Sequence, residues 1–426
     1  MKHTHFSSKQ VLLHSYQIFA GIFSAFVAAI LCFALFLSSR LPDRYYMAKG
    51  SEFSIGSNKM IQTKSAASSY PLSVYSSAGN TFPMSLKLFG AVEIKEVSVQ
   101  VVDRRVVSLC GTPFGIKMVT DGIMVIGTGG VSDLQNQIQN PAKQAGIQEG
   151  DVILSLNGEK LSSKKQLNQV IKNCGGKPIS MTVRRENDVK TVEVSPVKSS
   201  SDNSYHVGLW VRDSSAGIGT MTFYDPQSRC FAGLGHAICD IDTGQIMPLS
   251  QGEIVKASII GVEQGKSGTP GQLLGSFVTD QPVGTLYSNS CDGVYGKLSS
   301  PPPYSQTIPL AQSHEIQEGA VKILATVQGE KPRLFDAQIE KVSLSQNEPT
   351  KNMVIHITDP ELLQTAGGIV QGMSGSPIIQ NGMLVGAVTH VFVNDPTRGY
   401  GIFAENMDNT LLNLSAKCAD TYAEAA

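Results

Sequence analysis

The alternation of apolar and polar positions divides the chain into stretches of different character. From Ile18 to Leu37 almost every residue is apolar, and a helix needs about twenty such residues to cross a bilayer. Further on, Val92–Val101 alternates apolar and polar side chains, as a half-buried strand does. After residue 206, short alternating segments separated by glycine turns continue to about residue 393. This last pattern is typical of a β-barrel or sandwich, so we expect a mainly β protein.

The apolar run predicts a transmembrane helix over residues 18–38. It is longer than the apolar core of a secretory signal, and no small-residue cleavage site precedes Arg40. We therefore expect an uncleaved anchor with residues 1–17 in the cytoplasm and the bulk of the chain outside. Arg40 and Arg44 on the far side weaken the charge argument for this orientation. A cleaved signal sequence is the alternative.

Residues 39–98 are predicted to be a tether followed by a small β element. Residues 45–85 are rich in Ser, Gly, Ala, Lys and Tyr and show no sustained period, as in a flexible segment open to proteolysis.

The next unit, residues 99–198, contains the motif Pro-Ala-x-x-Ala-Gly-Ile-x-x-Gly-Asp-x-Ile over residues 141–153, followed by Asn157-Gly158. The motif predicts a short helix ended by Gly146, a strand and a hairpin, and it resembles bacterial protease-associated PDZ domains. Such domains bind an extended peptide as an added strand. By this resemblance, Phe114, Gly115 and Ile116 supply the loop that receives the peptide carboxylate. The alternative is that these residues only pack a turn and bind no ligand.

The last region, residues 199–426, contains Gly372-Met373-Ser374-Gly375-Ser376-Pro377. The glycines permit a tight turn that exposes the hydroxyl of Ser374, so Ser374 is the candidate nucleophile. The N–H groups of Gly372 and Ser374 can point together at a developing oxyanion.

The flanking sequence, Ile-Ile-Gln-Asn-Gly-Met-Leu-Val-Gly, predicts a strand, an Asn-Gly hairpin and a second strand. Together with the hexamer it resembles the nucleophile region of chymotrypsin-like serine proteases. It departs from them where Met373 replaces an acidic residue and Ser376 replaces a glycine. Ser376 is therefore a rival nucleophile, and a Gly/Ser-rich turn without chemistry is the plain alternative.

His236 is the candidate general base, because it follows Gly233-Leu234-Gly235 and is flanked by small residues that allow close approach. His206, His314, His356 and His390 are weaker candidates. The orienting acid cannot be chosen from spacing. The aspartates between the base and the nucleophile are Asp240, Asp242, Asp280, Asp292, Asp336 and Asp359. Asp359, which precedes Pro360, can equally cap a helix.

Composition narrows the function. The formal net charge of -1 over 426 residues argues against nucleic acid as the main partner. Seven cysteines include no C-x-x-C pair, so a structural zinc site is not expected. Cys230 and Cys239 bracket His236 and can form a bridge, although buried free thiols are the simpler interpretation. We expect no metal and no organic cofactor, since a serine triad needs only water.

Together, the anchor, the PDZ motif, Gly-Leu-Gly-His-Ala and Gly-Met-Ser-Gly-Ser-Pro resemble the stage IV sporulation protein B peptidases of endospore-forming bacteria. The resemblance implies a chymotrypsin-like serine endopeptidase whose triad falls on His236, Asp359 and Ser374. It also implies a location in the forespore membrane with the bulk of the chain in the intermembrane space. The implied partners are the enzyme's own tether, whose cleavage releases the enzyme, a membrane-bound regulator of the intramembrane protease that activates pro-sigma-K, and an inhibitor protein.

Two other functions remain open from the sequence. One is a non-catalytic PDZ scaffold with an inert protease-like barrel, which would tolerate loss of His236 or Ser374. The other is a general quality-control protease, but such enzymes usually place the PDZ domain after the protease.

Overall fold

The computed structural model describes residues 8–56, 60–65, 78–345 and 347–424. The chain forms two compact units. The first comprises residues 1–104 with the short segments 312–317 and 342–348. The second contains residues 105–311, 318–341 and 349–426.

The first unit begins with helix α1 (Ser8–Arg40). Within it, Tyr16–Arg40 is long and apolar enough to cross a membrane, with a mean hydropathy of 2.6, and is almost wholly exposed. The candidate span agrees with the anchor predicted over residues 18–38.

A four-stranded sheet follows, in the order β1-β4-β3-β2. Its strands are β1 (Arg44–Ala48), β2 (Ile61–Ser65), β3 (Thr81–Leu88) and β4 (Val92–Val102). The predicted strand over 92–101 is thus present. The flexible tether over 45–85 is wrong for the described residues, because Tyr45, Met47 and Phe53 are buried in the core of this sheet. Residues 57–59 and 66–77 of that stretch lie outside the described residues.

Two β-barrels form the body of the second unit. In the first, the pairing runs β6-β17-β18-β19-β16-β15 and closes through β15 and β6. The strands are β6 (Pro113–Thr128), β15 (Leu209–Asp225), β16 (Cys230–Gly233), β17 (Leu249–Glu263), β18 (Gln272–Ser290) and β19 (Gly293–Leu298). β5 (Val106–Leu109) pairs with β15, and β20 (Gln306–Pro309) pairs with β5.

The second barrel is closed in the order β21-β22-β23-β26-β25-β24. Its strands are β21 (Gly319–Ala325), β22 (Arg333–Val342), β23 (Met353–Ile357), β24 (Pro377–Gln380), β25 (Met383–Phe392) and β26 (Asp395–Phe403). Asn381 and Gly382, both with positive φ, make the predicted hairpin between β24 and β25. Helix α5 (Pro360–Ala366) precedes the nucleophile region, and α6 (Ala404–Glu424) ends the chain.

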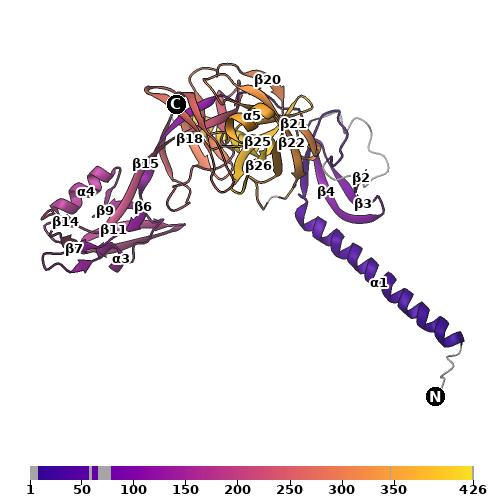
Figure 1. Cartoon of the computed structure of the whole chain (residues 1–426), viewed down its shortest axis with the longest axis horizontal. Coiled ribbons are helices and arrows are strands. Elements are labelled where there is room, and N and C mark those ends of the chain that lie inside the picture. Colours follow the sequence, from indigo (N-terminus) through magenta and orange to yellow (C-terminus); the bar gives the residue numbers. More distant parts are fainter. Residues whose placement is uncertain (1–7, 57–59, 66–77, 346, 425–426) are drawn as a thin grey trace, which may run out of the picture. The chain divides into compact units, whose positions relative to one another are not determined.

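The region with the PDZ motif extends from the far ends of β6 and β15, which pair along their length (Figure 1). Its other helices and strands are β7 (Val131–Ser132), β8 (Ile138–Gln139), α3 (Pro141–Gln144), β9 (Val152–Leu156), β10 (Glu159–Lys160), α4 (Lys164–Asn173), β11 (Ile179–Arg185), β12 (Asp188–Val194), β13 (Val197–Lys198) and β14 (Tyr205–His206). Its own core runs in sequence from Ile123 to Val211.

Because β6 starts in the first barrel, the PDZ region lies within the sequence of that barrel rather than before it. The boundaries 99–198 and 199–426 therefore differ from the structure. β15 is one long strand, with register shifts between Trp210 and Val211 and between Arg212 and Ser214.

Candidate active site

The nucleophile motif forms a turn just before β24. Gly372 and Gly375 adopt φ values of 95° and 94°, a region that residues with a Cβ rarely enter. A Cβ at Gly375 would also meet the carbonyl oxygen of Thr220. The two glycines are therefore required for the turn that presents Ser374, as the motif predicted.

Strand β15 of the first barrel holds this turn in place. The Thr220 hydroxyl donates to the Gly372 carbonyl at 2.8 Å, and the Thr220 N–H donates to the Ser374 carbonyl at 3.0 Å. The Thr222 hydroxyl donates to the Gly375 carbonyl at 2.8 Å. The barrel that carries His236 therefore fixes the backbone on both sides of Ser374.

Two backbone donors of the turn remain available. Among the described residues, neither the Gly372 N–H nor the Ser374 N–H donates to an acceptor, whereas Met373 N–H donates to Val370 and Gly375 N–H donates to Val388. The two N–H groups, on either side of residue 373, are therefore available as donors to an oxyanion.

His236 follows β16 through a turn in which Leu234 and Gly235 have positive φ. Its Nδ1 lies 2.7 Å from the carbonyl oxygen of Ala237. Because a carbonyl oxygen only accepts, Nδ1 carries the proton and Nε2 keeps its lone pair. Burial lowers the pKa of His236, although the bond to Ala237 acts in the opposite direction. The ring is therefore a neutral base at physiological pH.

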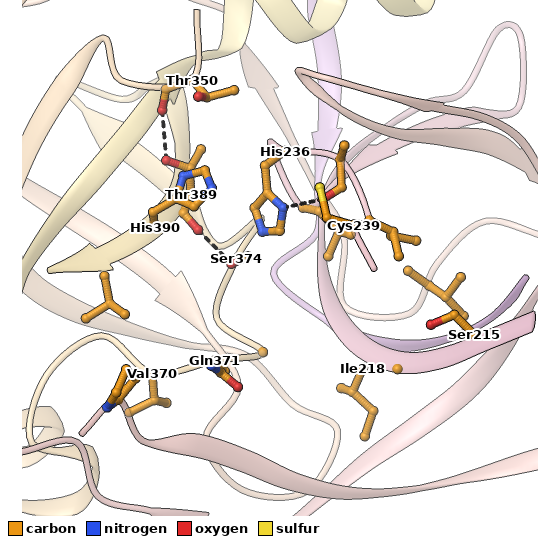
Figure 2. A pocket seen from close by; sticks show the side chains of 18 of the residues that line it. Ser215, Ile218, His236, Cys239, Thr350, Val370, Gln371, Ser374, Thr389 and His390 are labelled. Atoms are coloured by element: carbon orange, nitrogen blue, oxygen red, sulfur yellow. Dashed lines mark hydrogen bonds between the residues drawn. The ribbon is translucent and has the colours of Figure 1, made fainter. Parts of the chain in front are cut away.

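The end of β25 contributes the third part of the site. The Ser374 hydroxyl donates to the Thr389 carbonyl at 2.7 Å, and the ring of His390 lies 4.8 Å from that of His236 (Figure 2). Burial, then the neighbouring His236 and Lys351, lower the pKa of His390 to about 4. The sequence gives no reason to favour His390, because only the packing of the two barrels brings β25 beside the turn after β16.

These groups share a cavity of about 710 Å³. Ser374, His236, His390 and Gly372 line it, together with Cys239 and Cys291, and most of the remaining lining is apolar. Its described lining includes no Asp, Glu, Lys or Arg. The structure thus brings the predicted base, nucleophile and oxyanion donors together.

Asp359 lies elsewhere, at the start of α5. Its carboxylate accepts from the N–H groups of Asp336, Glu361 and Leu362 at 2.9 to 3.1 Å, which makes it the cap of that helix. No hydrogen bond or ion pair between described residues joins it to His236. The position predicted for the orienting acid therefore differs from the structure, in which a Thr-Asp-Pro-Glu sequence starts a helix and its carboxylate is already bound by the helix N–H groups.

The other aspartates do not take this place either. Asp240 and Asp242 pair with Arg212, and Asp292 accepts from Ser290 and Thr410. Asp336 pairs with Lys322, and the side chain of Asp280 is not among those described.

Ser376 is fully buried, and its hydroxyl has no hydrogen-bond partner among the described residues. Since Ser376 is absent from the lining of the cavity and Ser374 is part of it, the geometry favours Ser374 over its rival. Cys230 and Cys239 are both free thiols, so the bridge considered between them is absent.

The predicted carboxylate loop of the PDZ region is also placed differently. Phe114, Gly115 and Ile116 lie within β6, paired with β15 on one side and β17 on the other, and they are buried. They belong to the first barrel because their backbone groups are used in the sheet. The PDZ region instead has its own groove of about 220 Å³, whose lining includes Leu167 and Ile171 of α4 and Leu209 of β15.

Comparison with known proteins finds two families in this chain. Residues 203–408 match the family described as SpoIVB peptidase S55, and residues 138–185 match the PDZ domain family. A Clostridium perfringens protein named as a zinc metalloprotease is 31% identical over 70 residues, 16% of this chain and 21% of the relative. A Nostoc protein with a similar name is 35% identical over 83 residues, 18% of this chain and 23% of the relative. The chain thus spans about a fifth of the length of these curated relatives.

Two solved structures are also similar. The PDZ domain of an SdrC-like protein from Listeria monocytogenes has 15% identity and a TM-score of 0.18, covering 21% of this chain and 87% of its own. A mutant of the Rv3671c protease from M. tuberculosis, in its inactive form, has 17% identity and a TM-score of 0.28, covering 47% of this chain and 82% of its own.

Among the described residues, no group of three or more His, Cys, Asp or Glu side chains is arranged to hold a metal ion. The family matches confirm the peptidase and PDZ families predicted from the motifs. Residues 203–408 therefore form a domain of the SpoIVB peptidase S55 family, and the chain also contains a PDZ domain.

Proposed function

We propose that the chain is a serine endopeptidase in which Ser374 is the nucleophile and His236 the general base. The N–H groups of Gly372 and Ser374 form the oxyanion hole. One observation carries this proposal: nucleophile, neutral base and two unpaired backbone donors meet in a single cavity.

The first step of the reaction is a rotation of the Ser374 hydroxyl. In this structure the hydroxyl donates to the Thr389 carbonyl, so the bond to His236 Nε2 has to replace that contact. Ser374 Oγ then attacks the scissile carbonyl while Nε2 takes its proton. The oxyanion is stabilised by the two N–H groups, and Nε2 returns the proton to the leaving amine. Water repeats the sequence to release the acid.

In this arrangement the partner of the His236 imidazolium is a neutral carbonyl. The Ala237 carbonyl fixes the tautomer, but a neutral carbonyl stabilises a positive ring less than a carboxylate does. Asp359 can take that role only if it leaves the N-terminus of α5. Asp359→Asn distinguishes the two roles. An orienting acid predicts a loss of rate far larger than any loss of stability, whereas a cap predicts little change in either, because Asn caps a helix about as well as Asp does.

We extend the proposal to the setting that the family name suggests. Helix α1 anchors the enzyme in the forespore membrane, with the barrels in the intermembrane space. There it cleaves its own N-terminal region and then a membrane-bound regulator of an intramembrane protease, which activates pro-sigma-K processing. The PDZ groove holds an extended segment of such a protein substrate, and an inhibitor protein times the activity.

The test uses the full chain in detergent, as wild type and as Ser374→Ala, Ser376→Ala and His236→Ala. We expect fluorophosphonate labelling and self-cleavage to disappear in Ser374→Ala, to collapse in His236→Ala and to persist in Ser376→Ala. Labelling that survives in Ser374→Ala would refute the assignment of the nucleophile.

The alternative is a non-catalytic PDZ scaffold. The contact of Ser374 with Thr389 rather than His236 favours it, since that contact describes a resting site. The scaffold predicts that folded wild-type protein neither labels nor cleaves, even when a peptide of residues 57–77 is added.

A further inference from the structure

The cavity beside Ser374 differs from a cleft that recognises charge. Its described lining has no Asp, Glu, Lys or Arg, and both of its imidazoles are held neutral. A charged substrate side chain that enters this space would lose water and meet no charged side chain in the described lining. An uncharged apolar side chain would instead bury its surface against apolar walls.

The position of the first substrate side chain follows from the chemistry. The scissile carbonyl carbon must reach Ser374 Oγ while its oxygen faces the N–H groups of Gly372 and Ser374. The side chain before the scissile bond then lies beside the backbone that immediately surrounds these atoms. On one side this is Ile369, which precedes the turn, and on the other it is Val391, which follows Thr389.

These two side chains belong to one continuous wall. Val391 pairs with Gly399 across β25 and β26, and a Cβ placed on Gly399 would lie 2.7 Å from Ile369 Cδ1. Ile369 is buried, whereas Val391 is half-buried and faces the cavity space. The wall is therefore apolar and closely packed. Val391 is the more exposed of the two residues, so a substitution there changes the cavity directly.

We infer that Ile369 and Val391 make the enzyme cleave after uncharged aliphatic residues and reject lysine, arginine, aspartate and glutamate at that position. The inference rests on the proposed function, because it assumes that Ser374 is the nucleophile. It adds the class of substrate side chain, which neither the motifs nor the family match supplies.

The test uses peptidyl diphenyl phosphonates that differ only in the side chain next to phosphorus. Ser374 Oγ bonds to phosphorus and one phenol leaves, so the reaction needs the nucleophile and no peptide cleavage. For the full chain, we expect the valine probe to react at least about 100-fold faster than the lysine or glutamate probe. A ratio below about ten, for either charged probe, would overturn the inference.

A fluorophosphonate without any side chain separates the two possible failures. If it does not label Ser374, the proposed function fails. If it labels Ser374 while the phosphonates show no aliphatic preference, only the specificity is wrong.

Variants at Val391 test whether this wall causes the preference for aliphatic side chains. In Val391→Asp we expect the lysine probe to gain at least about tenfold relative to the valine probe, because the new carboxylate pairs with the ammonium group. Leu334→Asp, at an exposed position of β22 outside the cavity, is the matched control and should leave the ratio unchanged. If Val391→Asp does not fold, Val391→Ala widens the same wall, and the phenylalanine probe should gain about tenfold over the valine probe. Unchanged ratios in the folded variants would show that the wall does not select the substrate.

Discussion

Thr220 offers a direct test of how the two barrels cooperate at the active site. This buried residue of β15 donates through its hydroxyl to the Gly372 carbonyl at 2.8 Å and through its N–H to the Ser374 carbonyl at 3.0 Å. Thr220→Val keeps the volume and the backbone bond but removes the hydroxyl donor. The Gly372 carbonyl then loses its partner, so we expect the free energy of unfolding to fall by about 1–3 kcal/mol.

The same change should slow the reaction beyond its effect on stability. The lost bond fixes the peptide next to the one that carries the Ser374 N–H, so the oxyanion donors become less well positioned. We expect fluorophosphonate labelling to slow about tenfold, which corresponds to about 1.4 kcal/mol of activation free energy.

Thr326→Val is the matched control. Its hydroxyl is also buried and also donates to a glycine carbonyl, that of Gly111, at 3.0 Å, but neither residue lines the cavity. Chemical denaturation should give similar losses of stability for the two variants, while only Thr220→Val should label slowly. Equal labelling rates in the two variants would refute the view that β15 positions the nucleophile turn.

Three further predictions follow from the environment of particular groups. Because burial lowers the pKa of His236 from its usual 6.5, the neutral base persists as the pH falls through 6.5. The acidic half-point of the labelling rate should therefore lie below that value, and a half-point above it contradicts the assignment of a buried base. Cys239 and Cys291 are exposed and line the cavity, so alkylation by iodoacetamide should block labelling. The double variant Cys239→Ser, Cys291→Ser should label normally after the same treatment. Full labelling of the alkylated wild type would contradict the placement of these thiols. Asp151 is fully buried and pairs with Arg185 at 2.7 Å. Arg185→Met should therefore destabilise the PDZ domain by about 3–5 kcal/mol, measured by hydrogen exchange of β9 and β11, and an unchanged exchange rate would contradict the importance of this pair.

Much of the site could be predicted from the sequence because its signals are local. Positive-φ glycines at 372 and 375 and the Asn381-Gly382 hairpin depend on residues that are adjacent in the chain. A local signal of the same kind lies in the PDZ region, where the Ser163 side chain accepts from the Gln166 N–H and caps α4. Such features require no knowledge of the tertiary fold.

The domain boundary could not be predicted in this way. β6 and β15 each run from the first barrel into the PDZ domain without a break. A long strand that changes neighbours along its length shows no change of period at the boundary, so its alternation does not reveal where one core ends. The prediction that Phe114–Ile116 belong to the PDZ domain is therefore wrong.

The prediction of a tether in the N-terminal region fails for a related reason. β1 is five residues long, and its partner β4 begins more than forty residues later in the sequence. A short strand that pairs in parallel with a distant one carries little periodicity of its own. Tyr45 and Met47 are buried only because that sheet forms, so the stretch looked like a linker in isolation.

Asp359 shows how a strong local signal can conflict with a proposed functional one. The sequence Thr358-Asp359-Pro360-Glu361 favours a helix start on physical grounds alone, and in the structure three N–H groups bind the Asp359 carboxylate. Burial acts to raise the pKa of Asp359, but these bonds outweigh it and lower the pKa, so the carboxylate is stabilised where it is. An active state that uses Asp359 would have to replace those contacts with one to His236, at the expense of α5. The identity of the group that stabilises the His236 imidazolium is thus decided by the balance between a helix cap and a buried ion pair, and not by sequence spacing.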